Sequence, residues 1–102
     1  MSYIRGIGNP EKLYIWGESD GRVTIMKGRE HVGRVPRHIF EGIMLKFHED
    51  FWDGSLKYRG AELVQCEKNL DFWTLKYKDV ELTAYEVTWF YIAAGVKRRH
   101  SL

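Results

Sequence analysis

The sequence has little of the chemistry that marks a secreted, membrane or disulfide-bonded protein. Cys66 is the one cysteine among 102 residues, so neither an intrachain disulfide nor a Cys-x-x-Cys motif can form. No apolar run approaches the roughly 18 residues of a transmembrane helix, and the first residues show no charged region followed by an apolar stretch. We therefore expect a cytoplasmic protein with no membrane partner.

Charge of one sign and catalytic motifs are equally scarce. The 16 basic and 14 acidic residues leave a net charge of +2, which gives little long-range attraction to polyanions. The four histidines lack the spacing of a zinc site, and neither a phosphate-binding glycine loop nor a nucleophile motif occurs. We expect no metal, no cofactor and no enzymatic activity, and we interpret Cys66 as a buried structural residue.

What the chain does have is aromatic side chains, which make up 15% of its residues. With 44% hydrophobic residues, this composition predicts one globular domain over residues 1–102. No internal repeat is visible. The small size, the single cysteine and the lack of a catalytic motif are typical of regulatory or accessory proteins of bacteria and of mobile elements such as prophages.

Hydrophobic periodicity predicts the elements of the first half. Residues 13–16 and 23–26 favour strand, and an Asp-Gly turn between them predicts a β-hairpin. A short strand at residues 3–7 is expected before it. Residues 28–35 are rich in glycine and charge and are interpreted as a loop. The spacing of apolar residues then predicts an amphipathic helix over 36–49, with Pro36 in its first turn.

The second half is interpreted as a hairpin and a helix. Residues 55–67 and 70–79 pair around Lys68-Asn69, which places Arg59 opposite Lys78. This contact of like charges is unfavourable unless an anion or a nearby carboxylate compensates, or Gly60 forms a bulge that shifts the register. Residues 83–95 combine strand-favouring side chains with a capping box and a terminal glycine, and we predict a helix. The expected fold is α+β, with an antiparallel sheet of about 4–5 strands and two helices in the order β-β-α-β-β-α.

The first candidate site combines exposed aromatics with arginines. Tyr14 and Trp16 alternate with Leu13 and Ile15, so both faces of that strand are apolar and something must cover each face. Trp, Tyr and Arg are enriched at the centres of protein interfaces. The leading hypothesis is a non-enzymatic interaction or regulatory protein that binds another protein, or itself as a homodimer. The predicted protein-binding residues are Tyr14, Trp16, Arg29, Arg34 and Arg37.

The alternative is a nucleic-acid-binding protein that uses a basic strand face. Cations that follow phosphates and rings that stack on bases would suit a single strand. The residues of this alternative site are Lys57, Arg59, Phe72, Lys76 and Lys78. Glu62, Glu81 or Glu86 would neutralise this face if one of them lay beside it, and the sequence leaves the two functions open.

Overall fold

The computed structural model describes residues 11–100, which form seven strands and two helices. The α+β class is confirmed, but the predicted sheet of about 4–5 strands and the order β-β-α-β-β-α are wrong. The expected strand at residues 3–7 lies outside the described residues. The elements are β1 (Leu13–Gly17), β2 (Arg22–Lys27), β3 (Glu30–Pro36), α2 (Arg37–Glu49), β4 (Ser55–Tyr58), β5 (Ala61–Gln65), β6 (Phe72–Tyr77), β7 (Val80–Tyr85) and α3 (Glu86–His100).

The first sheet has the antiparallel order β1-β2-β3. The predicted hairpin of β1 and β2 is confirmed, and the carboxylate of Asp20 in its turn accepts hydrogen bonds from the backbone and side chain of Arg22. The loop predicted for residues 28–35 is wrong, because β3 returns along β2 after a tight turn at Gly28, whose φ is +62°. A bulge at Ile25 and Met26 shifts the register, which obscures the strand periodicity of this segment.

The second sheet has the antiparallel order β4-β5-β6-β7. The segment predicted as one long strand, 55–67, folds back at Arg59-Gly60, and residues 66–71 form the connection to β6. The predicted register is therefore wrong. Arg59 and Lys78 do not face each other across a ladder, because each lies in a turn with positive φ, +48° and +52° respectively.

The amphipathic helix predicted over 36–49 is confirmed as α2, with Pro36 directly before its first residue. Its buried residues are Ile39, Phe40, Ile43, Met44 and Phe47. Gly42 lies against the ring of Tyr58 in β4, and a Cβ at this position would overlap with that ring. A glycine in mid-helix is unfavourable, but here it allows β4 to approach the helix closely.

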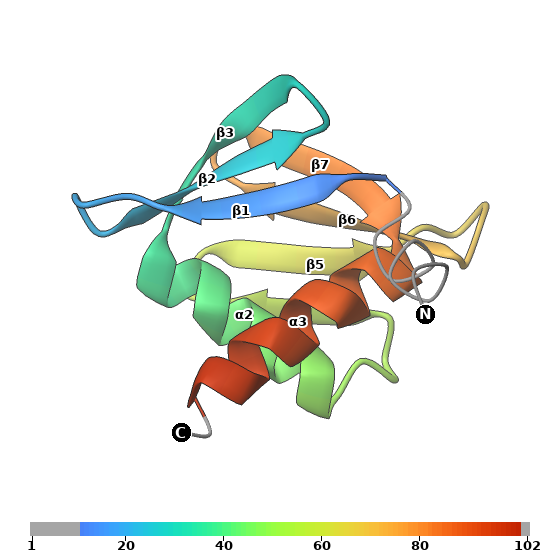
Figure 1. Cartoon of the computed structure of the whole chain (residues 1–102). Coiled ribbons are helices and arrows are strands. Elements are labelled where there is room, and N and C mark those ends of the chain that lie inside the picture. The colour runs from blue at the N-terminus through green and yellow to red at the C-terminus, as the bar shows by residue number, and fades with distance from the viewer. Residues whose placement is uncertain (1–10, 101–102) are drawn as a thin grey trace, which may run out of the picture.

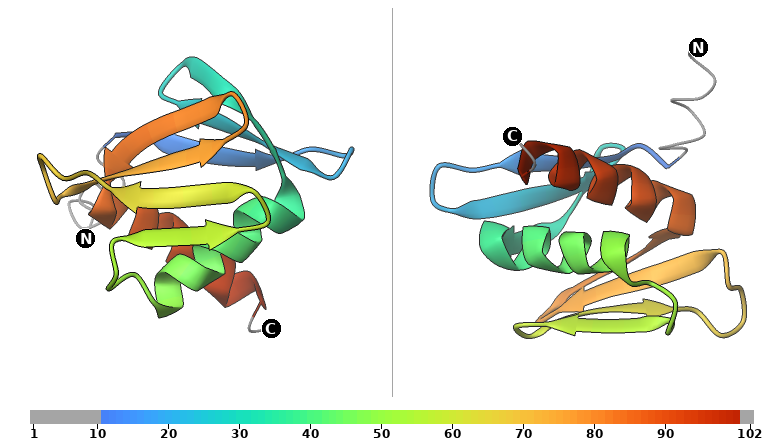
Figure 2. Two further views of the ribbon diagram at one scale, coloured as in Figure 1. Left: turned by 180° about the vertical axis from the view of Figure 1, so that it is seen from behind. Right: turned by 90° about the horizontal axis from the view of Figure 1, so that it is seen from below.

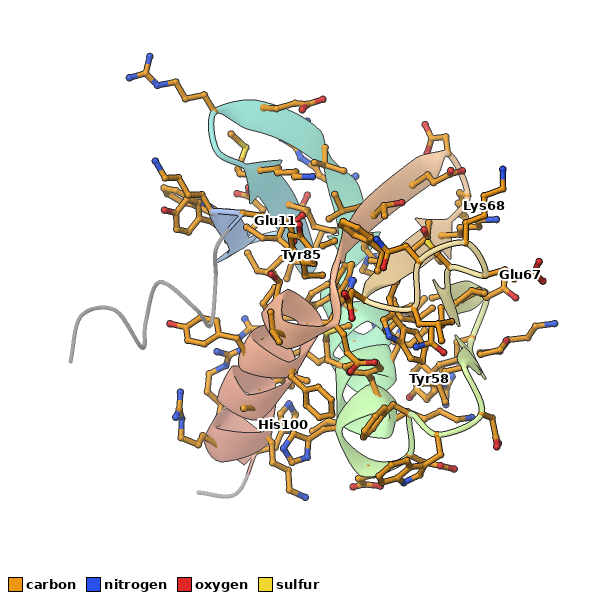
Figure 3. All side chains as sticks on the ribbon, turned by 90° about the vertical axis from the view of Figure 1, so that its right-hand side faces the viewer. Glu11, Tyr58, Glu67, Lys68, Tyr85 and His100 are labelled. Atoms are coloured by element: carbon orange, nitrogen blue, oxygen red, sulfur yellow. The ribbon has the colours of Figure 1, made fainter. Side chains whose placement is uncertain are left out.

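The last helix is present, but its predicted bounds of 83–95 are wrong at both ends. Residues 83–85 belong to β7, and α3 continues through Gly95 to His100. The start of α3 is fixed by Glu11, whose Oε2 accepts hydrogen bonds from the Tyr85 amide at 2.7 Å and the Thr88 hydroxyl at 3.1 Å. Figure 3 shows Glu11 next to Tyr85 at the beginning of α3, whose last residue is His100. The cap comes from a distant part of the chain, which a local sequence pattern does not reveal.

The two sheets meet along β3 and β7, and the two helices pack side by side against them (Figures 1 and 2). A Cβ on Gly33 of β3 would lie 2.7 Å from a methyl group of Val80 in β7, so glycine is required for this approach. The core is mainly aliphatic, with four buried aromatic residues, Phe40, Phe47, Trp73 and Trp89. Phe47 packs edge-on to Trp73 at 5.0 Å between ring centroids. Within residues 11–100, neither helix is long and apolar enough to cross a membrane.

The chain contains the same succession of elements twice. Three antiparallel strands are followed directly by a helix, first as β1-β2-β3-α2 and then as β5-β6-β7-α3. Val23 pairs with Val35 in the first unit as Trp73 pairs with Ala84 in the second. The buried residues of the helices keep the same spacing, with Ile39, Phe40, Met44 and Phe47 corresponding to Thr88, Trp89, Ala93 and Val96. The repeat is one of structure, because each of these matched pairs consists of two different residues.

Candidate functional site

The two aromatic residues of β1 lie on the outer face of the first sheet. Trp16 is 60% exposed and Tyr14 47% exposed, whereas Leu13 is buried in the core. The alternation of a strand places Tyr14 and Trp16 on one side and Leu13 and Ile15 on the other. The core covers the inner side, whereas Tyr14 and Trp16 on the outer side remain exposed.

Arg34 shares this outer face with Trp16. Trp16 pairs with Thr24 in β2, and Thr24 pairs with Arg34 in β3, so the three residues form one row across the sheet. The Thr24 hydroxyl donates a hydrogen bond to the Glu18 carboxylate. Hydrogen bonds from Arg22 chiefly lower the pKa of Asp20 in the nearby turn, and the positive charge of Arg34 adds to this effect.

The other two predicted arginines lie apart from this row. Arg29 lies in the turn between β2 and β3 and is exposed. Arg37 begins α2, where its Nε lies 3.3 Å from a carboxylate oxygen of Glu41, and its guanidinium approaches Gly17 at the end of β1. The structure therefore brings together Tyr14, Trp16 and Arg34, and places Arg37 near the end of β1 rather than on the outer face.

A groove runs beside β1, between this strand and α3, and the predicted site did not include its α3 side. Its main hollow has a volume of about 430 Å³, with an apolar floor that includes Ile15 and Phe40. A second hollow shares Ile15, Phe40 and Arg99 with the first and continues past Gly17. The α3 residues that line the main hollow are Tyr91, Ile92, Gly95, Val96, Arg98 and Arg99.

Basic side chains gather at the end of this groove around one acid. The Glu41 carboxylate lies 2.9 Å from the His100 ring, 3.3 Å from Arg37 and 3.4 Å from Arg99. Burial raises the pKa of Glu41, but the hydrogen bonds from His100, Arg37 and Arg99 outweigh that effect and hold the pKa below its ordinary value. Arg98 lines the same groove and is exposed, so cations outnumber the acid there.

Sequence reasoning missed the α3 side of the groove for a physical reason. Lys97, Arg98 and Arg99 are a basic run at the end of a helix, a pattern explained by the helix dipole alone. Only the tertiary packing of α3 beside β1 (Figure 1) brings this run close to Trp16. No local signal joins two segments that lie near opposite ends of the chain.

The basic residues of the alternative site do not form a continuous basic face. Lys57 pairs with Glu62, Glu62 with Lys76, and Lys76 with Glu81, so charges of opposite sign alternate across the outer face of the second sheet. Arg59 and Lys78 lie in turns, each over the ring of the preceding tyrosine. Phe72 stacks on Tyr85 with 4.3 Å between ring centroids.

The described part of the chain holds no group of three or more His, Cys, Asp and Glu side chains arranged to bind a metal ion. Cys66 is partly buried, with its sulfur 3.6 Å from the Thr74 hydroxyl. Comparison of the chain with models of protein families, with curated proteins and with solved structures finds no match. The case for a function therefore rests on the geometry of the surface.

Proposed function

We propose that this protein is a non-enzymatic interaction domain that binds another protein through the exposed side of β1. The observation that carries the proposal is the cluster of Trp16, Tyr14 and Arg34 on one face, next to a groove with an apolar floor. These are the residue types that contribute most to binding energy at protein interfaces.

Exposure of a single aromatic residue is not enough to mark a site. Trp52 is 77% exposed, but it lies in the loop after α2 and stacks on Phe51 at 4.4 Å between ring centroids. Trp16 differs because Tyr14 and the α3 residue Tyr91, both 47% exposed, line the same groove. Clustered aromatics next to an apolar groove form a continuous surface that a partner can bury.

The nucleic-acid alternative has less support than protein binding. Nucleic acids bind mainly through phosphates that contact a surface of predominantly positive charge. Glu62 and Glu81 alternate with Lys57 and Lys76 on the second sheet, so this face offers no such run of cations. Retention of the protein on single-stranded DNA at low salt, abolished by Lys57→Ala and Lys76→Ala together, would restore the alternative.

A photo-crosslinking amino acid at position 16 tests the proposal in an extract of the protein's own organism. A matched variant carries the same amino acid at position 52, which is at least as exposed. We expect position 16 to yield a discrete crosslinked protein that unlabelled protein competes away, and position 52 to yield none. Identical products from both positions, or no protein product from position 16, would contradict the proposed function.

A further inference from the structure

The comparison of the two repeated units shows that β1 lacks a neighbouring strand that β5 has. In the second unit, β5 pairs with β6 on one edge and with β4 on the other. In the first unit, β1 corresponds to β5 and pairs with β2, and within residues 11–100 no strand pairs with its other edge. The position that β4 occupies next to β5 therefore has a counterpart next to β1 that the described chain does not fill.

The hydrogen-bonding phase of β1 matches that of β5. The Glu18 amide donates to the Arg22 carbonyl, and the Gly28 amide donates to the Lys12 carbonyl. With the register of β1 and β2, these bonds show that every second residue of β1, including Trp16, is hydrogen-bonded to β2. The backbone groups of the residues between them, Ile15 and Gly17, then face the other edge. Their counterparts in β5 are Leu63 and Gln65, and the Gln65 amide donates to Gly54 just before β4.

Each of the two strands has the helix of the other unit beside it. α2, the helix of the first unit, lies beside the second unit and contacts β4 through Gly42, which lies against Tyr58, and through Lys46, whose Nζ donates to the Lys57 carbonyl at 3.1 Å. The positions of α3 that correspond to Gly42 and Lys46 are Tyr91 and Gly95. Both line the groove beside β1. A Cβ on Gly95 would stand in open space, with no atom within 4 Å apart from its neighbouring residues and the adjacent turns of its own helix backbone.

From this match we infer that β1 binds an extended segment of a partner protein as an added antiparallel strand, which lies in the groove between β1 and α3. The inference rests on the proposed function, because it specifies how the same surface binds. Main-chain hydrogen bonds to Ile15 and Gly17 would supply affinity, and side-chain pockets would supply specificity, as in other cases of strand addition.

The contacts of β4 predict which side chains the segment carries. Leu56 is opposite Leu63 and Tyr58 is opposite Ala61. Ile15 of β1 corresponds to Leu63, so the added strand should carry an aliphatic residue opposite Ile15. Tyr91 of α3 stands where α2 has Gly42, so the strand should carry a small residue where β4 has Tyr58. Leu63, which has β4 beside it, is fully buried, whereas Ile15 is only partly buried. An added strand would cover the exposed part of Ile15.

The charge of the groove predicts an acidic segment. The first residues of an antiparallel strand would lie beside the end of β1, where Arg98 and Arg99 line the groove. β1 itself carries no charged side chain. A second copy paired through its own β1 would bring another set of arginines rather than acids, so an acidic segment of a different protein is the better complement.

The probe is a synthetic peptide with three glutamates followed by Ser-Leu-Thr-Ser, compared with a scrambled peptide of the same composition. Titration calorimetry at low salt measures its affinity for the full-length protein. Hydrogen exchange followed by nuclear magnetic resonance then locates it. We expect the peptide to slow exchange of the Ile15 and Gly17 amides about tenfold or more, and to leave the Tyr14 and Trp16 amides, which already bond to β2, nearly unchanged.

Two variants with matched controls test the groove itself. Gly95→Leu places a side chain in the open space, and we expect at least a tenfold weaker affinity, with Gly95→Ala close to wild type. Arg98→Glu should weaken binding about fivefold at low salt, and Arg29→Glu, the same change at a distant turn, should not. Circular dichroism of each variant confirms that it folds.

Several outcomes would overturn the inference. They are no binding of the peptide, equal binding of the scrambled peptide, and unchanged affinity in Gly95→Leu. Sedimentation of the protein as a dimer with protected Ile15 and Gly17 amides would assign the edge to a second copy. If the peptide binds only after residues 1–10 are removed, the edge of β1 would be assigned to a segment of the chain itself. If crosslinking from position 16 succeeds while the peptide fails, the proposed function stands and strand addition is excluded.

Discussion

Gly42 of α2 lies against the ring of Tyr58 in β4, with no room for a Cβ between them. The contact holds an outer strand of the second sheet against the helix layer. The corresponding position of α3 is Tyr91, which lines the groove beside β1. Gly95 of α3 is also a helical glycine, but it faces open space. Substitutions at Gly42 and Gly95 can therefore be compared directly.

Gly42→Ala is expected to lower the free energy of unfolding by about 1–3 kcal/mol, because overlap with Tyr58 outweighs the helix-propensity gain of about 1 kcal/mol. Gly95→Ala keeps the gain without the overlap and should raise stability by about 1 kcal/mol. Urea unfolding of both variants measures the difference. A stabilising Gly42→Ala would contradict the close packing of α2 on β4.

Glu11→Ala is expected to destabilise the protein by about 1–2 kcal/mol, since the Tyr85 amide and the Thr88 hydroxyl lose their acceptor at the start of α3. Figure 3 shows Glu67 in the exposed connection between β5 and β6. Glu67→Ala is the matched control and should stay within about 0.5 kcal/mol of wild type. Equal melting temperatures for the two variants would rule out the capping role of Glu11.

Charge reversal separates the observed register from the one predicted from sequence. Lys76→Glu places an acid between Glu62 and Glu81 and should cost up to about 1 kcal/mol. Lys78→Glu changes a turn residue and should remain within about 0.5 kcal/mol, whereas a pairing of Arg59 with Lys78 predicts stabilisation. Thermal unfolding at low salt distinguishes the two, and a more stable Lys78→Glu variant would favour the sequence-based register.

Glu41, the acid surrounded by Arg37, Arg99 and His100 at the end of the groove, predicts a pH effect. The pKa of Glu41 is lowered in the folded protein, on balance by its three basic neighbours against the opposing effect of burial. Its stabilising contribution is therefore present above the ordinary carboxyl pKa and is lost as pH falls through the lowered folded value. Stability measured from neutral pH to about pH 3 should fall more steeply for wild type than for Glu41→Gln. Parallel curves would show that Glu41 contributes nothing.

The sequence predicted elements whose signals are local. The spacing from Ile39 to Phe47 defined α2, and the Asp20-Gly21 turn defined the first hairpin. It failed where the determining contact is distant or the period is interrupted. The bulge at Ile25 and Met26 hid β3, and the cap that Glu11 provides for α3 could not be seen from residues 83–86.

The candidate site divides in the same way. The exposure of Tyr14 and Trp16 followed from strand alternation next to Leu13, because only one face of a strand can join a small core. Arg34 joined them through the register of β3, which the sequence had not predicted. The groove with Gly95 and Arg98 depends on α3 packing beside β1, a long-range contact with no local pattern.

The central claim is that the exposed side of β1 binds a protein. The measurement that tests it most directly compares wild type with Trp16→Ala for affinity toward the partner recovered by crosslinking from position 16. We predict a loss of about 2 kcal/mol or more in binding free energy, as for an aromatic residue at the centre of an interface, with unfolding stability changed by less than about 0.5 kcal/mol. Equal affinity of the two proteins would contradict the claim.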